Sequence, residues 1–133
     1  MRRFTLPLAL ALACMATVAS AEDPAVPMPR FVEETASAGI QSVYAGEWQY
    51  MVGGGVAAFD CNDDQYPDLL LAGGEKPGKF YRNASTRGGT LKFVEEKSGL
   101  EFEHMTGAYP IDIDSDGKTD LVVLRVGENV VMR

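Results

Sequence analysis

The fold is decided by the nine-residue stretch Asp112-Ile113-Asp114-Ser115-Asp116-Gly117-Lys118-Thr119-Asp120, which leads directly into Leu121-Val122-Val123-Leu124. Acidic residues occupy positions 1, 3, 5 and 9 of this stretch, and a glycine occupies position 6. Alternate side chains of a tightly curled loop can point to one centre, and glycine permits the positive φ that such a curl needs. The apolar run that follows is typical of a strand covered on both faces. We therefore predict an acidic loop between two β-strands.

The same layout occurs 52 residues earlier, where Asp60 opens the stretch D-C-N-D-D-Q-Y-P-D before Leu69-Leu70-Leu71-Ala72. Other short segments recur as well: the tetrapeptide Phe-Val-Glu-Glu at 31–34 is repeated at 93–96. Phe80-Tyr81-Arg82 has a counterpart 51 residues later in Val131-Met132-Arg133. Because the order of the features repeats at intervals of about 50 to 60 residues, the sequence predicts an array of structural repeats.

Each repeat is predicted to be rich in short strands. The chain has 14 glycines and 7 prolines among its 133 residues, which favours frequent turns over long helices. A weak helical pattern at 33–38 is too short to form a helix alone. The expected strands are 56–59, 68–72, 79–82 and 92–95 in the first repeat, and 110–113 and 121–126 in the second. The predicted fold class is all-β.

The two acidic loops are predicted to bind Ca²⁺. Carboxylates that converge within a few ångströms repel one another strongly unless a cation lies between them. Hard oxygen ligands on a flexible loop suit Ca²⁺, whereas Mg²⁺ demands stricter octahedral geometry. The expected ligands in the second loop are Asp112, Asp114, Asp116, Asp120 and the main-chain carbonyl of Lys118; those in the first loop are Asp60, Asn62, Asp64, Asp68 and the carbonyl of Tyr66.

The first loop is expected to bind the ion more weakly than the second. Gln65 stands at position 6, where a non-glycine residue at positive φ costs about 1 kcal/mol. Asn62 brings an oxygen ligand without a charge. The alternative for both loops is a solvated, aspartate-rich turn. An EF-hand is excluded, because position 12 is Leu71 or Val123 within a strand-like run, where an EF-hand needs a glutamate and flanking helices.

The N-terminus is interpreted as a secretory signal peptide spanning residues 1–21. Arg2 and Arg3 precede a mostly apolar run at 4–18, and Ala19-Ser20-Ala21 offers a cleavage site. The apolar run is too short for a membrane span. A lipoprotein signal ending at Cys14 is the alternative. Residues 22–30, with three prolines, are expected to be an extended linker, and the mature chain is expected to be secreted, periplasmic or at the cell surface.

Charge and residue counts exclude several function classes. The formal charge is −7, and it becomes −9 once Arg2 and Arg3 are removed with the signal peptide. Nucleic-acid binding depends on cationic side chains that neutralise phosphates, so this partner is excluded. A single histidine, His104, excludes a zinc cluster built from several histidines. Cys61 and Trp48 are expected to be packing residues, although Trp48 could instead belong to an aromatic ligand platform.

The acidic loops and the sequence segments that flank them resemble those of a known family. The pattern D-x-D-x-D-G-x-x-D between two strands resembles the calcium loop of FG-GAP/VCBS repeats. The words at 31–34, 53–60 and 80–83 further resemble the ASPIC/UnbV group, which is related to cartilage acidic protein. The resemblance covers residues 31–133 and implies a β-propeller of about seven four-stranded blades. This chain would then hold about two blades, an incomplete propeller that is marginally stable alone and a fragment of a longer protein.

The expected function is that of a non-enzymatic, exported, Ca²⁺-stabilised module that binds an unknown protein or glycan, as in adhesion. The alternative is the N-terminal part of an extracellular enzyme that acts on polysaccharide and is built on a propeller. Fold alone does not decide between them. Apart from the acidic loops, the sequence offers no convergent set of base, acid and oxyanion-stabilising groups, which favours the binding module.

Overall fold

The computed structural model describes residues 26–133. The predicted signal peptide at 1–21 and the first part of the predicted linker lie outside the described residues. The chain divides into two units, and the described part of the first, 26–31, is exposed and has no helix or strand. The second unit, Val32–Arg133, contains all of the described strands. Within residues 26–133, no helix has the length and the apolar character needed to cross a membrane.

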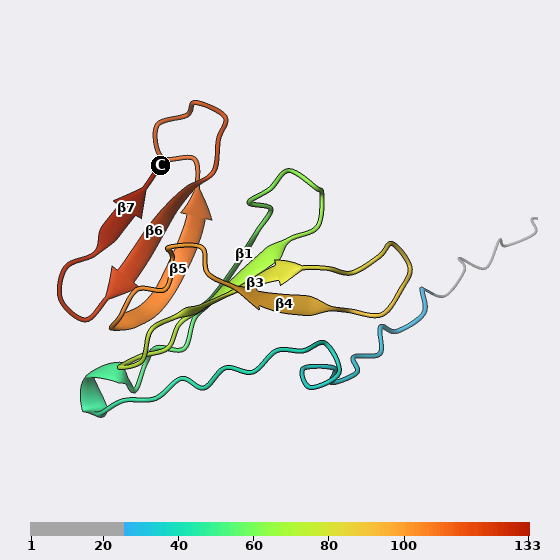
Figure 1. Cartoon of the computed structure of the whole chain (residues 1–133), viewed down its shortest axis with the longest axis horizontal. Coiled ribbons are helices and arrows are strands. Elements are labelled where there is room, and N and C mark those ends of the chain that lie inside the picture. The colour runs from blue at the N-terminus through green and yellow to red at the C-terminus, as the bar shows by residue number, and fades with distance from the viewer. Residues whose placement is uncertain (1–25) are drawn as a thin grey trace, which may run out of the picture. The chain divides into compact units, whose positions relative to one another are not determined.

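Seven strands form two antiparallel sheets, as predicted for an all-β fold. In the first sheet, each of four strands pairs with the next along the chain, and three strands do so in the second (Figure 1). The first sheet consists of β1 Val56–Phe59, β2 Asp68–Leu71, β3 Lys79–Asn83 and β4 Phe93–Glu96; the second consists of β5 Met105–Ile111, β6 Asp120–Arg125 and β7 Val130–Met132. The described residues form no closed barrel.

Most predicted strands agree with the structure to within about one residue, but the strand that enters the second acidic loop was placed wrongly. It was predicted at 110–113, whereas β5 begins at Met105 and ends at Ile111. The register shifts between Met105 and Gly107, and this irregularity disrupts the alternation that reveals a strand in sequence. The weak helical pattern at 33–38 corresponds to a turn in which Ala38 N–H donates to Glu34 O at 2.8 Å.

The core consists of eight buried apolar side chains, four contributed by each half of the unit. The set comprises Ala57, Leu70, Ala72 and Phe80 from the first half and Met105, Ala108, Leu121 and Val123 from the second. Leu70, Met105 and Val123 have no exposed surface. Burial of such side chains contributes roughly 1.5–3 kcal/mol each, so this shared core is the main force that holds the two sheets together.

The opposite face of the first sheet is covered by the segment that precedes it. Tyr81 is fully buried there, and its hydroxyl donates to Gln41 O at 2.6 Å and accepts from Gln41 N–H at 3.0 Å. Lys79 Nζ also donates to Gln41 O at 2.8 Å. Further along, Ala45 pairs with Gly74 in an isolated parallel bridge. The preceding segment therefore covers this face of the sheet at β3, whereas Val56 in β1 and Val94 in β4 remain exposed.

A short 3₁₀ helix, Trp48–Tyr50, lies between this covering segment and β1. Trp48, expected to be a packing residue, is not packed within the described residues, where 78% of its surface is exposed. Tyr50 is the buried residue of this helix, and its hydroxyl lies 2.6 Å from His104 Nδ1. The aromatic contact with the second sheet is therefore made by Tyr50 rather than by its neighbour.

Main-chain contact joins the two sheets at Gly55, which immediately precedes β1. Gly55 N–H donates to Thr106 O at 3.1 Å. A Cβ atom added to Gly55 would lie 2.9 Å from Gly107 Cα and 3.3 Å from Thr106 O, closer than side-chain carbons normally approach. A Cβ added to Gly107 would instead lie 3.9 Å from Gly55 Cα, an ordinary contact. The close approach of the two backbones therefore requires glycine at position 55 but not at position 107.

We predict that Gly55→Ala lowers the free energy of unfolding by about 1–3 kcal/mol, because the backbone of β5 must move to admit the methyl group. Gly107→Ala is the matched control, since it adds the same group at the same contact where there is room for it. Urea denaturation followed by circular dichroism measures both variants. Equal stability losses would show that this contact does not constrain the packing of the sheets.

Candidate metal centre

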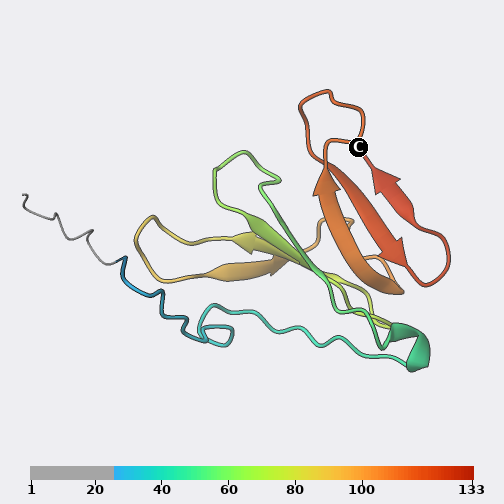
Figure 2. The ribbon, with the colours of Figure 1, turned by 180° about the vertical axis from the view of Figure 1, so that it is seen from behind.

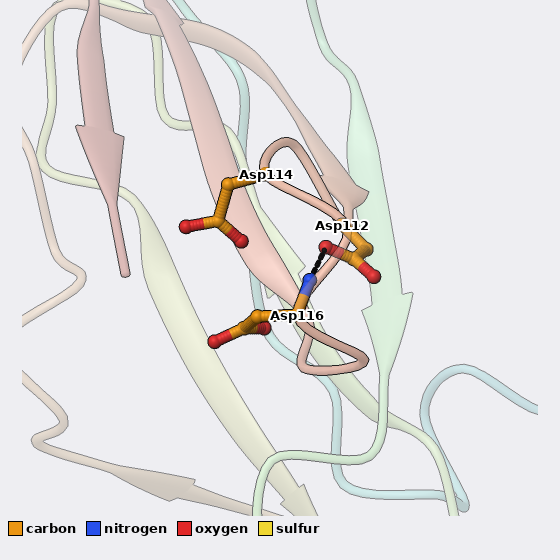
Figure 3. A group of neighbouring side chains, drawn as sticks. All are labelled: Asp112, Asp114 and Asp116. Atoms are coloured by element: carbon orange, nitrogen blue, oxygen red, sulfur yellow. Dashed lines mark hydrogen bonds between the residues drawn. The ribbon is translucent and has the colours of Figure 1, made fainter.

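The second acidic loop joins β5 to β6 and brings three aspartates together. Asp112, Asp114 and Asp116 each offer a carboxylate oxygen, and these oxygens lie within 4.8 Å of one another (Figure 3). All three residues are exposed. Positions 1, 3 and 5 of the predicted site thus converge, because the loop curls so that alternate side chains point to the same side.

Main-chain N–H groups of the loop hold two of these carboxylates. Asp112 Oδ1 accepts from Asp116 N–H at 3.1 Å, and its Oδ2 accepts from Gly117 N–H at 2.9 Å. Asp116 Oδ1 accepts from Lys118 N–H at 2.9 Å. Among the described residues, no main-chain N–H donates to the Asp114 carboxylate; its recorded partner is Arg133, with Nη1 3.3 Å from Oδ2. Asp114 is therefore the member of the cluster least involved in shaping the loop.

The first acidic loop, between β1 and β2, repeats this hydrogen-bond pattern. Asp60 Oδ1 accepts from Asp64 N–H at 3.1 Å, and its Oδ2 accepts from Gln65 N–H at 2.7 Å. Asp64 Oδ1 accepts from Tyr66 N–H at 2.8 Å. At position 3 the loops differ, because Asn62 Nδ2 donates to Asp64 Oδ2 at 3.0 Å, whereas the second loop has a carboxylate there. The first loop therefore has one negatively charged side chain fewer than the second at positions 1, 3 and 5.

These N–H groups change the acidity of Asp60. Desolvation raises the pKa of this carboxyl group, but the main-chain hydrogen bonds from Gln65 and Asp64 stabilise the carboxylate and outweigh it. The net result is that the pKa of Asp60 lies below its ordinary value. The group is therefore fully charged at neutral pH.

Backbone conformation is shared between the loops in detail. Position 6 has a positive φ in both, 71° at Gln65 and 85° at Gly117, so the strained conformation expected for Gln65 is present. Position 4 also has a positive φ, 60° at Asp63 and 62° at Ser115, and the spacing of the acidic residues does not predict this. Aspartate adopts a positive φ more readily than most residues, so the residue type at position 63 gave a weak indication of this conformation.

The aspartates at position 9 lie beneath the loops rather than at their rims. Asp68 is fully buried: its Oδ1 accepts from Asn83 N–H at 2.7 Å and its Oδ2 accepts from Cys61 N–H at 3.3 Å. Asp120 is also buried, and its Oδ2 accepts from Ile113 N–H at 3.0 Å. Each therefore ties position 2 of its loop to the start of the following strand. Their predicted role as ligands remains a prediction, as does that of the carbonyls of Tyr66 and Lys118.

A hollow of about 440 Å³ lies between the two acidic loops, which stand at the same end of their sheets (Figure 2). Cys61 lines it, so the expectation that this cysteine is a packing residue is wrong: the residue is exposed. Desolvation of the thiol and its interaction with Asp68 raise the pKa of Cys61 to about 12. At neutral pH the thiol therefore stays protonated.

We predict that exchanging the residues at position 6 reverses the strain of the two loops. Gln65→Gly should raise the free energy of unfolding by about 1 kcal/mol, and Gly117→Gln should lower it by a similar amount, because φ is positive at both sites. Thermal and urea denaturation in the presence of a chelator measure these changes in the free energy of unfolding without a contribution from bound metal. A neutral effect of Gly117→Gln would contradict the explanation.

A second pair of variants tests the buried aspartates. Asp68→Asn should cost about 1–3 kcal/mol, because Asn83 N–H and Cys61 N–H donate to different carboxylate oxygens, and in the amide one of these N–H groups would face an NH2 group and lose its acceptor. Asp120→Asn is the matched control and should cost less, since its amide oxygen can keep the bond from Ile113. Denaturation in chelator compares them, and an equal or larger loss for Asp120→Asn would contradict this assignment.

Comparison with known proteins agrees with the repeat seen in the geometry. Residues 60–123 match the model of the FG-GAP-like repeat family. The match begins at position 1 of the first acidic loop and runs through the second loop into β6. No curated protein and no solved structure matches the chain. The chain therefore contains an FG-GAP-like repeat at residues 60–123.

Proposed function

We propose that this chain is an exported Ca²⁺-binding repeat module whose principal site is the cluster of Asp112, Asp114 and Asp116. The observation that carries the proposal is the convergence of these three carboxylates within 4.8 Å. Carboxylates this close repel one another, and a cation between them turns the repulsion into attraction. The role proposed for the ion is structural, and the chain acts as a binding module rather than as an enzyme.

The chemistry of the donors favours Ca²⁺ over other ions. All three side chains offer hard carboxylate oxygens, and they stand on an exposed loop that can adjust its geometry. Ca²⁺ accepts six to eight oxygen ligands in flexible arrangements, whereas Mg²⁺ requires a near-ideal octahedron. Asp120 and the carbonyl of Lys118 are proposed to complete the coordination in the second loop.

A second, weaker Ca²⁺ site is proposed in the first loop. Asp60 and Asp64 occupy the same places as Asp112 and Asp116, and they accept the same main-chain hydrogen bonds from positions 5, 6 and 7. Asn62 lowers the charge of this site by one, and Gln65 retains a positive φ at a cost in energy. Asn62, Asp68 and the carbonyl of Tyr66 are proposed as its further ligands.

The family resemblance extends the proposal to the architecture. The words at 31–34 and 53–59 lie outside the residues that match the FG-GAP-like repeat, and they resemble the ASPIC/UnbV group. We propose on this basis that the two sheets are successive blades of a partial β-propeller. Sheets built of strands that each pair with the next in sequence are compatible with that arrangement.

A partner protein or glycan is proposed as the ligand of the exported module, in the secreted, periplasmic or cell-surface space. Removal of the predicted signal peptide leaves a formal charge of −9, and two bound Ca²⁺ ions would change it to −5. A surface of this sign does not attract nucleic acid. The ions would fix the turn between two strands in each repeat, and so hold the exposed loops in one conformation.

Calorimetric titration with Ca²⁺ tests the proposal. Two binding steps are expected, and Asp114→Asn should weaken the tighter step by about tenfold, since it removes one charged ligand. Asp114 is chosen because it accepts no main-chain hydrogen bond from the described residues, so the loop itself should survive. Glu128→Gln is the matched control: it removes the same charge from an exposed site outside the acidic loops.

The control separates specific coordination from general electrostatics. Glu128→Gln should leave both binding steps unchanged within error. Equal weakening by the two variants would mean that Ca²⁺ is attracted by net charge alone. An absence of measurable heat and of Ca²⁺-dependent thermal stabilisation would refute the proposed function.

A further inference from the structure

The second acidic loop contains the only Asp-Gly pair in the sequence, Asp116-Gly117, and the chain has no Asn-Gly pair. Glycine suits the path of the loop at this position, because φ at Gly117 is 85°. Aspartate suits the proposed ion at the preceding position, because Asp116 belongs to the carboxylate cluster. The geometry of the loop and its charge therefore favour these two residue types side by side.

An aspartate that precedes a glycine can react with its own main chain. The glycine amide nitrogen attacks the aspartate Cγ, the new C–N bond forms, and the amide proton leaves together with the carboxyl OH as water. The product is a five-membered succinimide ring. This ring closes most readily before glycine, because glycine has no Cβ atom that obstructs the nitrogen.

Water then opens the succinimide at one of its two carbonyl carbons. Attack at Cγ breaks the new C–N bond and restores aspartate. Attack at the main-chain carbonyl breaks the original peptide bond and gives isoaspartate, in which the main chain runs through Cβ and Cγ and the free carboxylate is attached to Cα. One water is released and one is consumed, so no other reactant is needed and the mass of the chain stays the same.

The conformation of the loop brings the reacting groups of this pair together. Asp116 Oδ1 accepts from Lys118 N–H at 2.9 Å, and this hydrogen bond closes a ring that contains both Asp116 Cγ and Gly117 N. Asp116 is exposed, and a Cβ atom added to Gly117 would meet no atom within 4 Å. The side chain is therefore folded back toward the following peptide group, at a place that water can reach.

One hydrogen bond opposes the reaction. Gly117 N–H donates to Asp112 Oδ2 at 2.9 Å, and this bond must open before the nitrogen can attack. Bonds in exposed loops open more readily than those in a core, and repulsion among the three carboxylates favours opening. A cation bound to Asp112 and Asp116 would hold the bond closed. The reaction should therefore be fastest in the ion-free loop.

We propose that Asp116-Gly117 is a modification site at which the ion-free chain converts spontaneously to isoaspartate, and that a bound cation protects it. The protection rests on the proposed Ca²⁺ site, whereas the reaction itself does not. Isoaspartate lengthens the main chain of the loop by one carbon atom and moves the carboxylate at position 5. The converted loop therefore no longer presents this ligand of the proposed site in its original place.

The first acidic loop provides an internal control, because its hydrogen bonds are equivalent and its residue pair is different. Asp64 Oδ1 accepts from Tyr66 N–H at 2.8 Å, and Gln65 N–H donates to Asp60 Oδ2 at 2.7 Å. Gln65, however, carries a Cβ atom and a long side chain beside the attacking nitrogen. Asp64 should therefore react about tenfold more slowly than Asp116, despite the shared loop geometry.

Incubation of the full-length chain in oxygen-18 water at neutral pH tests the proposal. Each opening of a succinimide adds one oxygen-18 atom, and peptide mass spectrometry with electron-based fragmentation locates this label and distinguishes isoaspartate from aspartate. In chelator, conversion is expected at Asp116 and about tenfold less at Asp64. Gln65→Gly should raise conversion at Asp64 about tenfold, and Gly117→Gln should lower it at Asp116 by a similar factor.

A parallel incubation with Ca²⁺ separates this proposal from the proposed function. Ca²⁺ at about ten times its dissociation constant should slow conversion at Asp116 about tenfold, because an ion that binds only the closed loop lowers the open fraction in proportion. Conversion that Ca²⁺ does not slow would support the modification site and contradict the Ca²⁺ site in this loop. Equal conversion at Asp116 and Asp64 in chelator, or no gain at Asp64 from Gln65→Gly, would overturn the proposal.

Discussion

Electrostatic repulsion among neighbouring carboxylates is the constraint on which the account of this protein depends. Asp112, Asp114 and Asp116 present oxygens within 4.8 Å of one another on an exposed loop. Main-chain N–H groups offset part of this repulsion at Asp112 and Asp116, but Asp114 faces the others with only an arginine beside it. A bound divalent cation would remove the conflict without any change in the path of the loop.

The buried aspartates show how such a loop is attached to its sheet. Asp68 and Asp120 begin β2 and β6, and each accepts a hydrogen bond from the residue that follows the first aspartate of its loop. Asp68 also accepts from Asn83 in β3, so the loop is tied to two strands at once. The proposed ion, with the position-9 aspartate among its ligands, would bind a turn whose base is already attached to the strands, and its effect would therefore extend into the hairpin.

Much of this fold was predictable from the sequence because the decisive features are local. Apolar runs bounded by acidic loops predicted β2 and β6, and the spacing of aspartates predicted that Asp112, Asp114 and Asp116 converge. Features that depend on tertiary packing were not predictable. Tyr50 is buried and contacts His104, whereas Trp48 is exposed, and no local pattern in the sequence distinguishes these two aromatic residues. The early start of β5 was hidden by the irregular register near Gly107.

The most direct test of the central claim is the anomalous X-ray signal from a crystal grown with Ca²⁺. A peak is expected about 2.3–2.6 Å from carboxylate oxygens of Asp112, Asp114 and Asp116, with the loop otherwise in the conformation described above. Three carboxylates turned away from one another, with no anomalous peak between them at saturating Ca²⁺, would contradict it.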